Sequence, residues 1–129
     1  ITFQPLVAPD ALPAVIAAHD IGLALEEPAI RNRDLTITNK ILQYLNAGLA
    51  IVATDTAGQR EVLAHAPDAG VFIPPAADAT ARATLLDELI RDRAGLHRRQ
   101  SAARRLAEKN YCWEHEAPRL VALVEKALA

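Results

Sequence analysis

The sequence predicts an α/β domain in which a parallel sheet of about four strands has helices packed on both faces. Short apolar segments alternate with stretches of helical periodicity, which is typical of strand-helix-strand units. Residues 49–53 are apolar without polar alternation, as expected for a strand buried on both faces. The region after residue 77 shows only helical periodicity, which predicts a helical C-terminal segment.

The first third of the chain predicts two strands and one helix. Residues 1–4 have the composition of a strand, and residues 9–18 predict a helix with Asp10 as its N-cap. Residues 20–25 form a second apolar segment, which predicts a second strand. Residues 26–38 are polar and contain Pro28, which predicts a loop.

The middle third predicts two more strands and two helices. Residues 39–47 have helical periodicity, and Gly48 is suited to end that helix in the left-handed conformation. After the buried strand 49–53, a turn over residues 54–58 leads into a helix over residues 59–65. Residues 70–73 predict the last strand, which Pro74 and Pro75 would end.

The last third predicts three helices. Asp78 is a suitable N-cap for a helix that reaches residue 92, and a second helix is expected over residues 96–109. A final helix includes Leu120 and Val124, and it should begin close to Pro118 because proline is tolerated only in the first turn.

Composition limits the function classes. The 129 residues fit one domain, and 51% hydrophobic with 23% charged residues is typical of a globular chain. A net charge of −2 lacks the cationic excess that nucleic-acid binding requires, so no nucleic-acid partner is expected. A single cysteine, Cys112, excludes an internal disulfide, and no apolar run approaches a membrane span. We therefore expect a cytoplasmic location.

Polar residues gather where the predicted strands end. In a parallel sheet the ligand crevice lies outside the carboxyl ends of the strands, next to helix N-termini. The helix starts at Asn39-Lys40 and at Thr56 to Gly58 should both lie on this rim. Free N–H groups and the Lys40 ammonium favour an anion there, and Gln43 lies one turn further along the helix, where its amide suits ribose hydroxyls. The pattern therefore predicts a nucleotide-binding site.

The same stretch resembles a known family. The segments are NKILQYLNAG (39–48), AIVATD (50–55), Gly58, Glu61, GVFIPP (70–75) and YCWE (111–114). Their order and spacing resemble the nucleotide-sugar-binding C-terminal half of GT-B glycosyltransferases, in particular the family 4-like group, also described as glycosyl transferases group 1. The resemblance spans nearly the whole chain.

The resemblance implies an enzyme built of two facing Rossmann-like halves, in which the C-terminal half holds the sugar donor. It implies that Asn39 and Lys40 meet the diphosphate, Gln43 the ribose, and Thr56 to Gly58 the phosphate or sugar. It also implies transfer of a hexosyl group from a nucleotide diphosphate sugar to a glycan or lipid-linked acceptor. No metal or other cofactor is expected, and the sequence contains no Asp-x-Asp motif.

Two departures from the family pattern affect these expectations. Many relatives have two glutamates eight positions apart, and the matching positions here are Leu35 and Gln43. Leu35 cannot bind a sugar hydroxyl through polar atoms, so Glu26 or Glu27 would have to replace it. The catalytic residues and the stereochemical outcome of transfer therefore remain unassigned by the sequence.

The second departure is length. A complete half would have further strands before residue 1, and a complete enzyme would have an acceptor-binding half as well. We therefore expect residues 1–129 to be a donor-binding domain that does not transfer sugar alone. The unfinished sheet edge at residues 1–4 would be a surface for self-association.

Other interpretations stay open. The domain could be a degenerate relative that binds a nucleotide or a partner without catalysis, and Lys40 and Gln43 could simply face solvent. A receiver-like signalling domain fits the size, but the required acidic residues are absent from residues 4–9. The arginine-rich region over residues 91–109 is interpreted first as an ion-paired solvated face, and alternatively as a peripheral contact with the inner membrane face.

Overall fold

Three parallel strands form the sheet of the computed structural model, which describes residues 2–74 and 76–129. The strand order is β1-β2-β3, with Ile21 paired to Ala50 and Ile51 paired to Gly70. The elements in chain order are α1 (Leu12–Ala17), β1 (Ile21–Ala24), α2 (Arg31–Leu35), α3 (Asn39–Ala47), β2 (Ala50–Thr54), α4 (Ala57–Leu63), the 3-10 turn η1 (Pro67–Ala69), β3 (Gly70–Ile73), α5 (Ala79–Arg91), α6 (Arg93–Asn110) and α7 (Trp113–Leu128).

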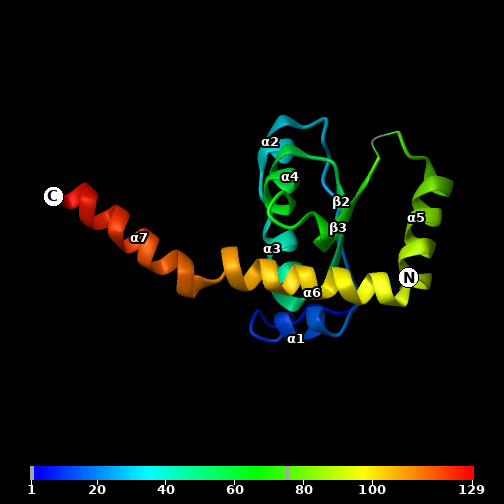
Figure 1. The fold of residues 1–129 in the computed structure, drawn as a ribbon, viewed down its shortest axis with the longest axis horizontal. Coiled ribbons are helices and arrows are strands. Elements are labelled where there is room, and N and C mark those ends of the chain that lie inside the picture. The colour runs from blue at the N-terminus through cyan, green and yellow to red at the C-terminus, as the bar shows by residue number, and fades with distance from the viewer. Residues whose placement is uncertain (1, 75) are drawn as a thin grey trace.

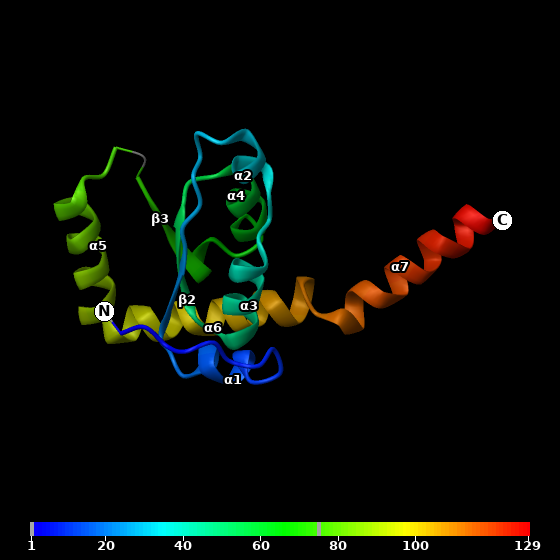
Figure 2. The same ribbon diagram turned by 180° about the vertical axis from the view of Figure 1, so that it is seen from behind.

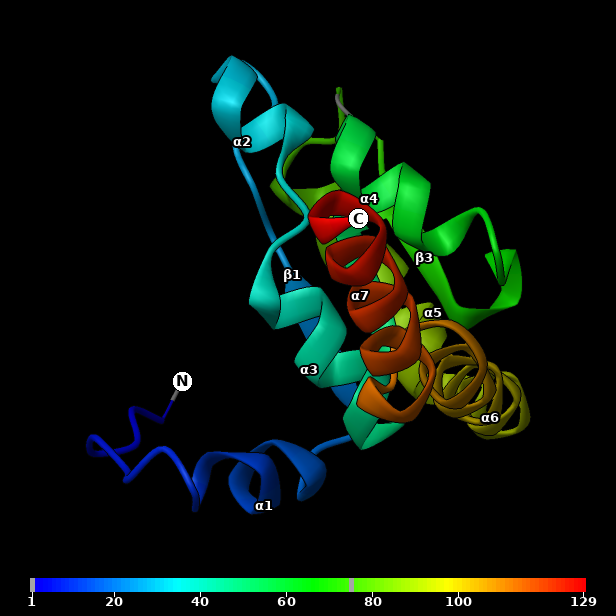
Figure 3. The same cartoon turned by 90° about the vertical axis from the view of Figure 1, so that its left-hand side faces the viewer.

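The expected strand over residues 1–4 is wrong for the residues that the structure describes. Residues 2–8 form no strand, and the side chains of Phe3 and Leu6 are 90% and 102% exposed. Residue 1 lies outside the described residues. A strand needs a hydrogen-bonded neighbour, and the N-terminal segment runs beyond α1, away from β1 (Figure 3). The described sheet therefore has three strands where about four were expected, and β1 is one of its two edges.

Three helix predictions also need correction. Helix α1 begins after Ala11, and Asp10 makes no capping hydrogen bond. The predicted loop over residues 26–38 contains the short helix α2. Pro118 lies inside α7, beyond its first turn, because Cys112 is the N-cap and the acidic residues after Trp113 favour an earlier helix start.

Other predictions are confirmed. The helix over residues 39–47 is α3, and Gly48 ends it with a φ of 72°, in the left-handed region. The strand over residues 70–73 is β3, directly before Pro74, while Pro75 lies outside the described residues. Asp78 caps α5, since its Oδ1 accepts a hydrogen bond from the Ala81 amide at 2.8 Å.

Helices cover both faces of the sheet, as the sequence predicts. Successive residues of β2 point to opposite faces, so Ile51 packs in one cluster of buried residues and Val52 in another. The larger cluster joins the sheet to α3, α4 and α6, and the smaller one joins it to α5 through Leu89. Figure 2 shows α5 on one side of the strands and α3 with α4 on the other.

The two last helices differ in their packing. Helix α6 buries six residues and crosses one end of the sheet, whereas α7 buries none and extends away from the body of the molecule (Figure 1). Over the described residues, every helix is too short or too polar for a membrane crossing.

Candidate functional site

A cavity of about 410 Å³ lies where all three strands end. Each strand contributes the residues at its carboxyl end, and two basic side chains approach from α2 and α5. This is the position at which parallel sheets bind ligands. The lining residues are Leu25, Glu26, Glu27, Pro28, Arg33, Thr54, Asp55, Ile73, Pro74 and Arg82, and we call this cavity the crevice.

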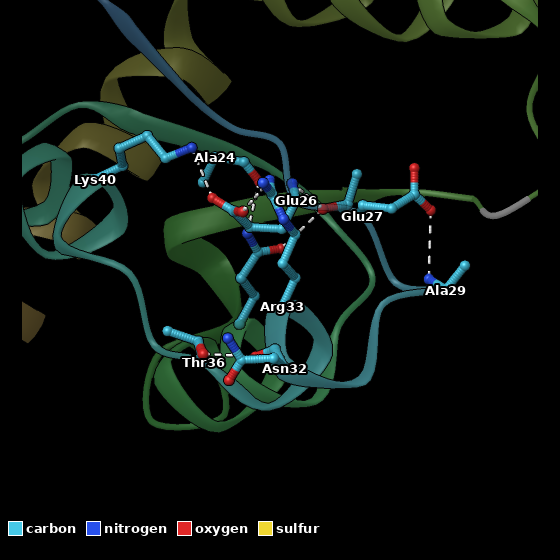
Figure 4. A network of polar contacts seen from close by, with 10 residues as sticks. Ala24, Glu26, Glu27, Ala29, Asn32, Arg33, Thr36 and Lys40 are labelled. Atoms are coloured by element: carbon cyan, nitrogen blue, oxygen red, sulfur yellow. Dashed lines mark hydrogen bonds and ion pairs between the residues drawn. The ribbon is translucent and has the colours of Figure 1, made fainter.

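Glu26 is the buried charge of the crevice. Its side chain is only 5% exposed, and it lies two residues after Ala24, the last residue of β1. Lys40 Nζ lies 2.6 Å from its Oε1, and Arg33 Nη1 lies 3.8 Å from its Oε2 (Figure 4). Two cations from two helices therefore compensate one buried carboxylate, as burial of a charge requires.

A network of buried polar groups holds the backbone beside Glu26. The Glu26 amide donates to Thr54 Oγ1 at 2.7 Å, and the Thr54 hydroxyl donates to Gln59 Oε1 at 3.3 Å. Gln59 is fully buried, and its Nε2 donates to the Ala24 carbonyl at 2.7 Å. The network joins the ends of β1 and β2 to the start of α4. It therefore fixes the strand ends that line the crevice.

Asp55 is held by a bidentate ion pair at the crevice rim. Arg60 Nη2 donates to Asp55 Oδ2 at 2.6 Å, and Arg60 Nε donates to Oδ1. These hydrogen bonds place the pKa of the Asp55 carboxyl below its ordinary value, although partial burial acts in the opposite direction. Asp55 therefore stays ionised at neutral pH, and its carboxylate is already paired with Arg60.

The helix openings at Lys40 and Gly58 are neighbours, as predicted. A Cβ built on Gly58 would lie 2.5 Å from the Thr36 carbonyl oxygen, and Thr36 lies just before the start of α3. Gly58 is buried by this close approach of backbone to backbone. Its lack of a side chain lets α4 pack against the segment that leads into α3, and in this structure no ligand is needed to explain it.

The opening of α4 does not offer the free N–H groups that the sequence suggested. Asp34 Oδ1 accepts from the Ala57 amide at 3.0 Å, and the Thr56 hydroxyl accepts from the Gln59 amide at 3.3 Å. Thr56 is fully buried as the N-cap. An acidic side chain from α2 already occupies the positive end of this helix, which sequence reasoning missed because Asp34 lies 23 residues from Ala57.

The residues at the start of α3 make fewer side-chain hydrogen bonds than those at the start of α4. Thr38 is its N-cap, but its side chain makes no capping hydrogen bond, and its buried Oγ1 has no hydrogen-bond partner among the described residues. Asn39 is exposed, and Lys40 follows it with a side chain that is 49% exposed. Of the two predicted anion-binding openings, α3 is therefore the one whose side chains remain accessible.

Gln43 lies apart from the crevice. It borders a separate cavity of about 310 Å³ together with Ile16 of α1 and Arg104 of α6. The expectation that Gln43 and Lys40 face one pocket is therefore not met in this structure. The residue is one turn further from the strand ends, about 4.5 Å along the helix axis, where α1 and α6 flank α3.

Sequence reasoning missed several residues of the crevice. Arg33 and Arg82 stand in segments predicted as a loop and as a helix, and only the fold brings them to the strand ends. Gln59 supports the crevice without lining it, and the sequence places it only at the start of a helix. A glutamine one turn after a polar strand end, next to the Thr56 cap, was the available signal for a buried amide.

The fold is an α/β domain whose parallel sheet is covered by helices on both faces, and a charged crevice lies at its strand ends. The family model described as "Glycosyl transferases group 1" matches residues 1–92, which contain all three strands and α1 to α5. The chain therefore belongs to this family and is a GT-B glycosyltransferase-like domain. No curated protein and no solved structure gives a significant match.

Proposed function

We propose that the crevice and the adjoining start of α3 bind the nucleotide diphosphate sugar of a glycosyltransferase. In this proposal the chain is the donor-binding part of an enzyme that transfers a hexosyl group to a glycan or lipid-linked acceptor. The observation that supports it most is the meeting of Lys40, Arg33 and buried Glu26 at the strand ends. The family match supports the reaction class.

The cations beside the crevice suit the diphosphate of the donor. When an acceptor hydroxyl attacks the anomeric carbon, negative charge grows on the departing diphosphate. Lys40 and Arg33 can stabilise this charge, with Asn39 at the helix start, if their side chains turn from Glu26 to the phosphates. Arg82 of α5 also lines the crevice. These side chains, rather than a bound metal, neutralise the diphosphate in our proposal.

The carboxylates beside these cations can bind the sugar part of the donor. Glu26 and Glu27 line the crevice, and a carboxylate accepts hydrogen bonds from sugar hydroxyls. Leu35, at the position where many relatives have an acid, is apolar and 57% exposed. We therefore assign the sugar contact to Glu26, which the Thr54 and Gln59 network holds in place.

A second function is a non-catalytic domain that binds a nucleotide or a partner. Two observations favour it: Leu35 has no polar atom on its side chain, and the opening of α4 is filled by Asp34. In this case the crevice would bind the nucleotide, and contacts with the sugar would add nothing to the affinity.

A titration of the chain with UDP, GDP and ADP, followed by amide chemical shifts, tests the proposal. Shifts should concentrate in residues 26–28, 33–40 and 54–56, and Lys40→Ala should weaken binding about tenfold or more. Arg91→Ala removes an exposed arginine on α5, outside the crevice, and should leave the affinity unchanged. Absence of shifts up to about millimolar nucleotide would contradict the proposal.

The same assay separates the two functions. If the crevice holds a sugar donor, Glu26→Gln should weaken the binding of the matching nucleotide sugar more than that of the free nucleotide, because only the former offers sugar hydroxyls. Equal weakening of both ligands would favour the non-catalytic domain.

A further inference from the structure

The largest of the described cavities is not the crevice. A cavity of about 660 Å³ lies between η1 and α6, against about 410 Å³ for the crevice. Its α6 wall consists of residues 94, 97, 98, 99, 101, 102 and 105. Apart from residue 99, their spacing of three and four positions places them on one helix face. Asp68 of η1 contributes to the opposite wall.

This wall is basic. Arg98, Arg99 and Arg105 line the cavity, and Asp68 is the one acidic residue among the lining side chains. In a chain of net charge −2, this is a local reversal of sign. A basic cavity of this kind attracts anions, since the field of clustered arginines is compensated only in part.

The arginines of this wall have few partners. Arg98 lies 3.7 Å from Asp92, and Arg105 forms no ion pair within the described parts of the chain. Arg104, on another side of the same helix, is bound to Glu108 and to the Asn46 carbonyl at 2.7 and 2.6 Å. Helix α6 therefore uses Arg104 for packing and leaves the cavity arginines largely uncompensated.

Arg99 adds a buried donor. Its Nε is shielded from solvent and has no hydrogen-bond partner in residues 2–74 and 76–129. The residue also borders a smaller cavity that contains Glu88 and Asp92, but it forms no ion pair with either in the part of the chain described. A buried N–H group without an acceptor is unfavourable, so a turn of the Arg99 side chain toward an acceptor in the cavity would be favoured.

The basic cavity is separate from the crevice. Its wall residue Asp68 belongs to η1, which ends directly before β3 begins, so the cavity lies at the amino end of that strand. The crevice lies at the carboxyl ends. Figure 1 shows α6 crossing the end of the sheet that is away from α2.

We infer that the cavity between η1 and α6 is a second anion site, which takes a phosphate or pyrophosphate group. The guanidinium fork matches phosphate oxygens in pairs, which makes arginine the side chain best suited to this group. Arg98 and Arg105 are two helical turns apart, about 10.5 Å along the helix axis. Their side chains can therefore each donate hydrogen bonds to one of two linked phosphates. The phosphate can belong to a soluble molecule or to a lipid headgroup.

The test uses the whole chain and inorganic pyrophosphate, with amide shifts as the readout. Shifts should include residues 97–105, and Arg99→Gln combined with Arg105→Gln should weaken the affinity that they report about tenfold or more. The control, Arg91→Gln with Arg93→Gln, removes the same charge from residues that do not line the cavity and should change the affinity less than about threefold. Asp68→Asn should tighten binding, and Lys40→Ala should leave these shifts unchanged.

A second arm identifies the source of the phosphate. Vesicles of phosphatidylglycerol and of phosphatidylcholine are mixed with the chain and sedimented. A lipid headgroup is indicated if the chain sediments only with the anionic vesicles, and if the cavity variant loses this sedimentation while the control variant keeps it. Pyrophosphate binding without sedimentation indicates a soluble ligand. Equal weakening by the cavity and control variants, or no binding in either arm, would overturn the inference.

Discussion

Gln59 shows how one buried side chain can hold two strand ends and a helix together. Its amide group accepts from Thr54 and donates to the Ala24 carbonyl, and its own backbone N–H is bonded to the Thr56 cap. Because the residue is fully buried, water cannot replace any partner that is lost. The crevice therefore depends on a residue that does not line it.

Gln59→Ala should lower the free energy of unfolding by about 2–4 kcal/mol, since it leaves a buried carbonyl and hydroxyl unpaired and opens a cavity. Urea unfolding measures the change. Gln100→Ala is a matched control, because its amide makes an exposed contact with the Asp20 carbonyl at 3.2 Å, and it should cost less than about 1 kcal/mol. Similar losses for both variants would refute the role of the network.

Asp55 and Arg60 predict a dependence on pH. The hydrogen bonds from Arg60 lower the pKa of Asp55 in the folded chain below the unfolded value of about 3.9. The pair therefore contributes its stabilisation in full above about pH 5, and this contribution is lost as the pH falls through the folded pKa.

Arg60→Gln should raise the pKa of Asp55, as followed by the chemical shift of its carboxyl carbon between about pH 2 and 6. Arg91→Gln removes another exposed guanidinium, which is paired elsewhere, with Asp87, and should leave the Asp55 titration in place. If the titration midpoint of Asp55 does not move in the Arg60 variant, the ion pair has no electrostatic effect in solution.

At the scale of elements, α6 and α7 differ although both are long and charged. Helix α6 packs against α3, η1 and β2, whereas α7 buries no residue and exposes Leu120, Val121 and Val124. Pro118 removes one backbone hydrogen bond from the interior of α7. Packing on a core, more than helix propensity, stabilises a protein helix, so α7 should be the weaker element.

Hydrogen exchange of the isolated chain tests this difference. Amides of α7 should exchange at least about a hundredfold faster than those of the central turns of α6, because opening α7 exposes no buried side chain. Amides of α5, which buries Leu89 alone, should lie between the two and serve as an internal reference. Equal protection of α6 and α7 would show that α7 is covered in solution.

At the scale of the whole molecule, the sheet separates two unequal cores and two ends with different chemistry. Ile51 faces the larger core and Val52 the smaller one, while Leu23, which pairs with Val52, stays 45% exposed. The carboxyl ends hold the mixed charges of the crevice, and the amino end of β3 adjoins the basic cavity. The domain therefore has two separate charged cavities, one at each end of the sheet.

The sequence by itself determined the class of fold, the family resemblance and the elements with strong local signals. Helix α3 with its Gly48 stop, β3 and the Asp78 cap were predictable because their causes lie within a few neighbouring residues. The placement of both helix openings on one rim followed from the rule for parallel strands.

Only the tertiary structure decided which groups meet. The pairing of Glu26 with Lys40, the capping of α4 by Asp34 and the separation of Gln43 from the crevice depend on contacts between distant segments. The absence of a fourth strand from residues 2–74 and 76–129 has the same origin, since a strand exists only where a neighbour supplies its hydrogen bonds. Local sequence sets propensity, but side-chain partners are chosen when the elements pack.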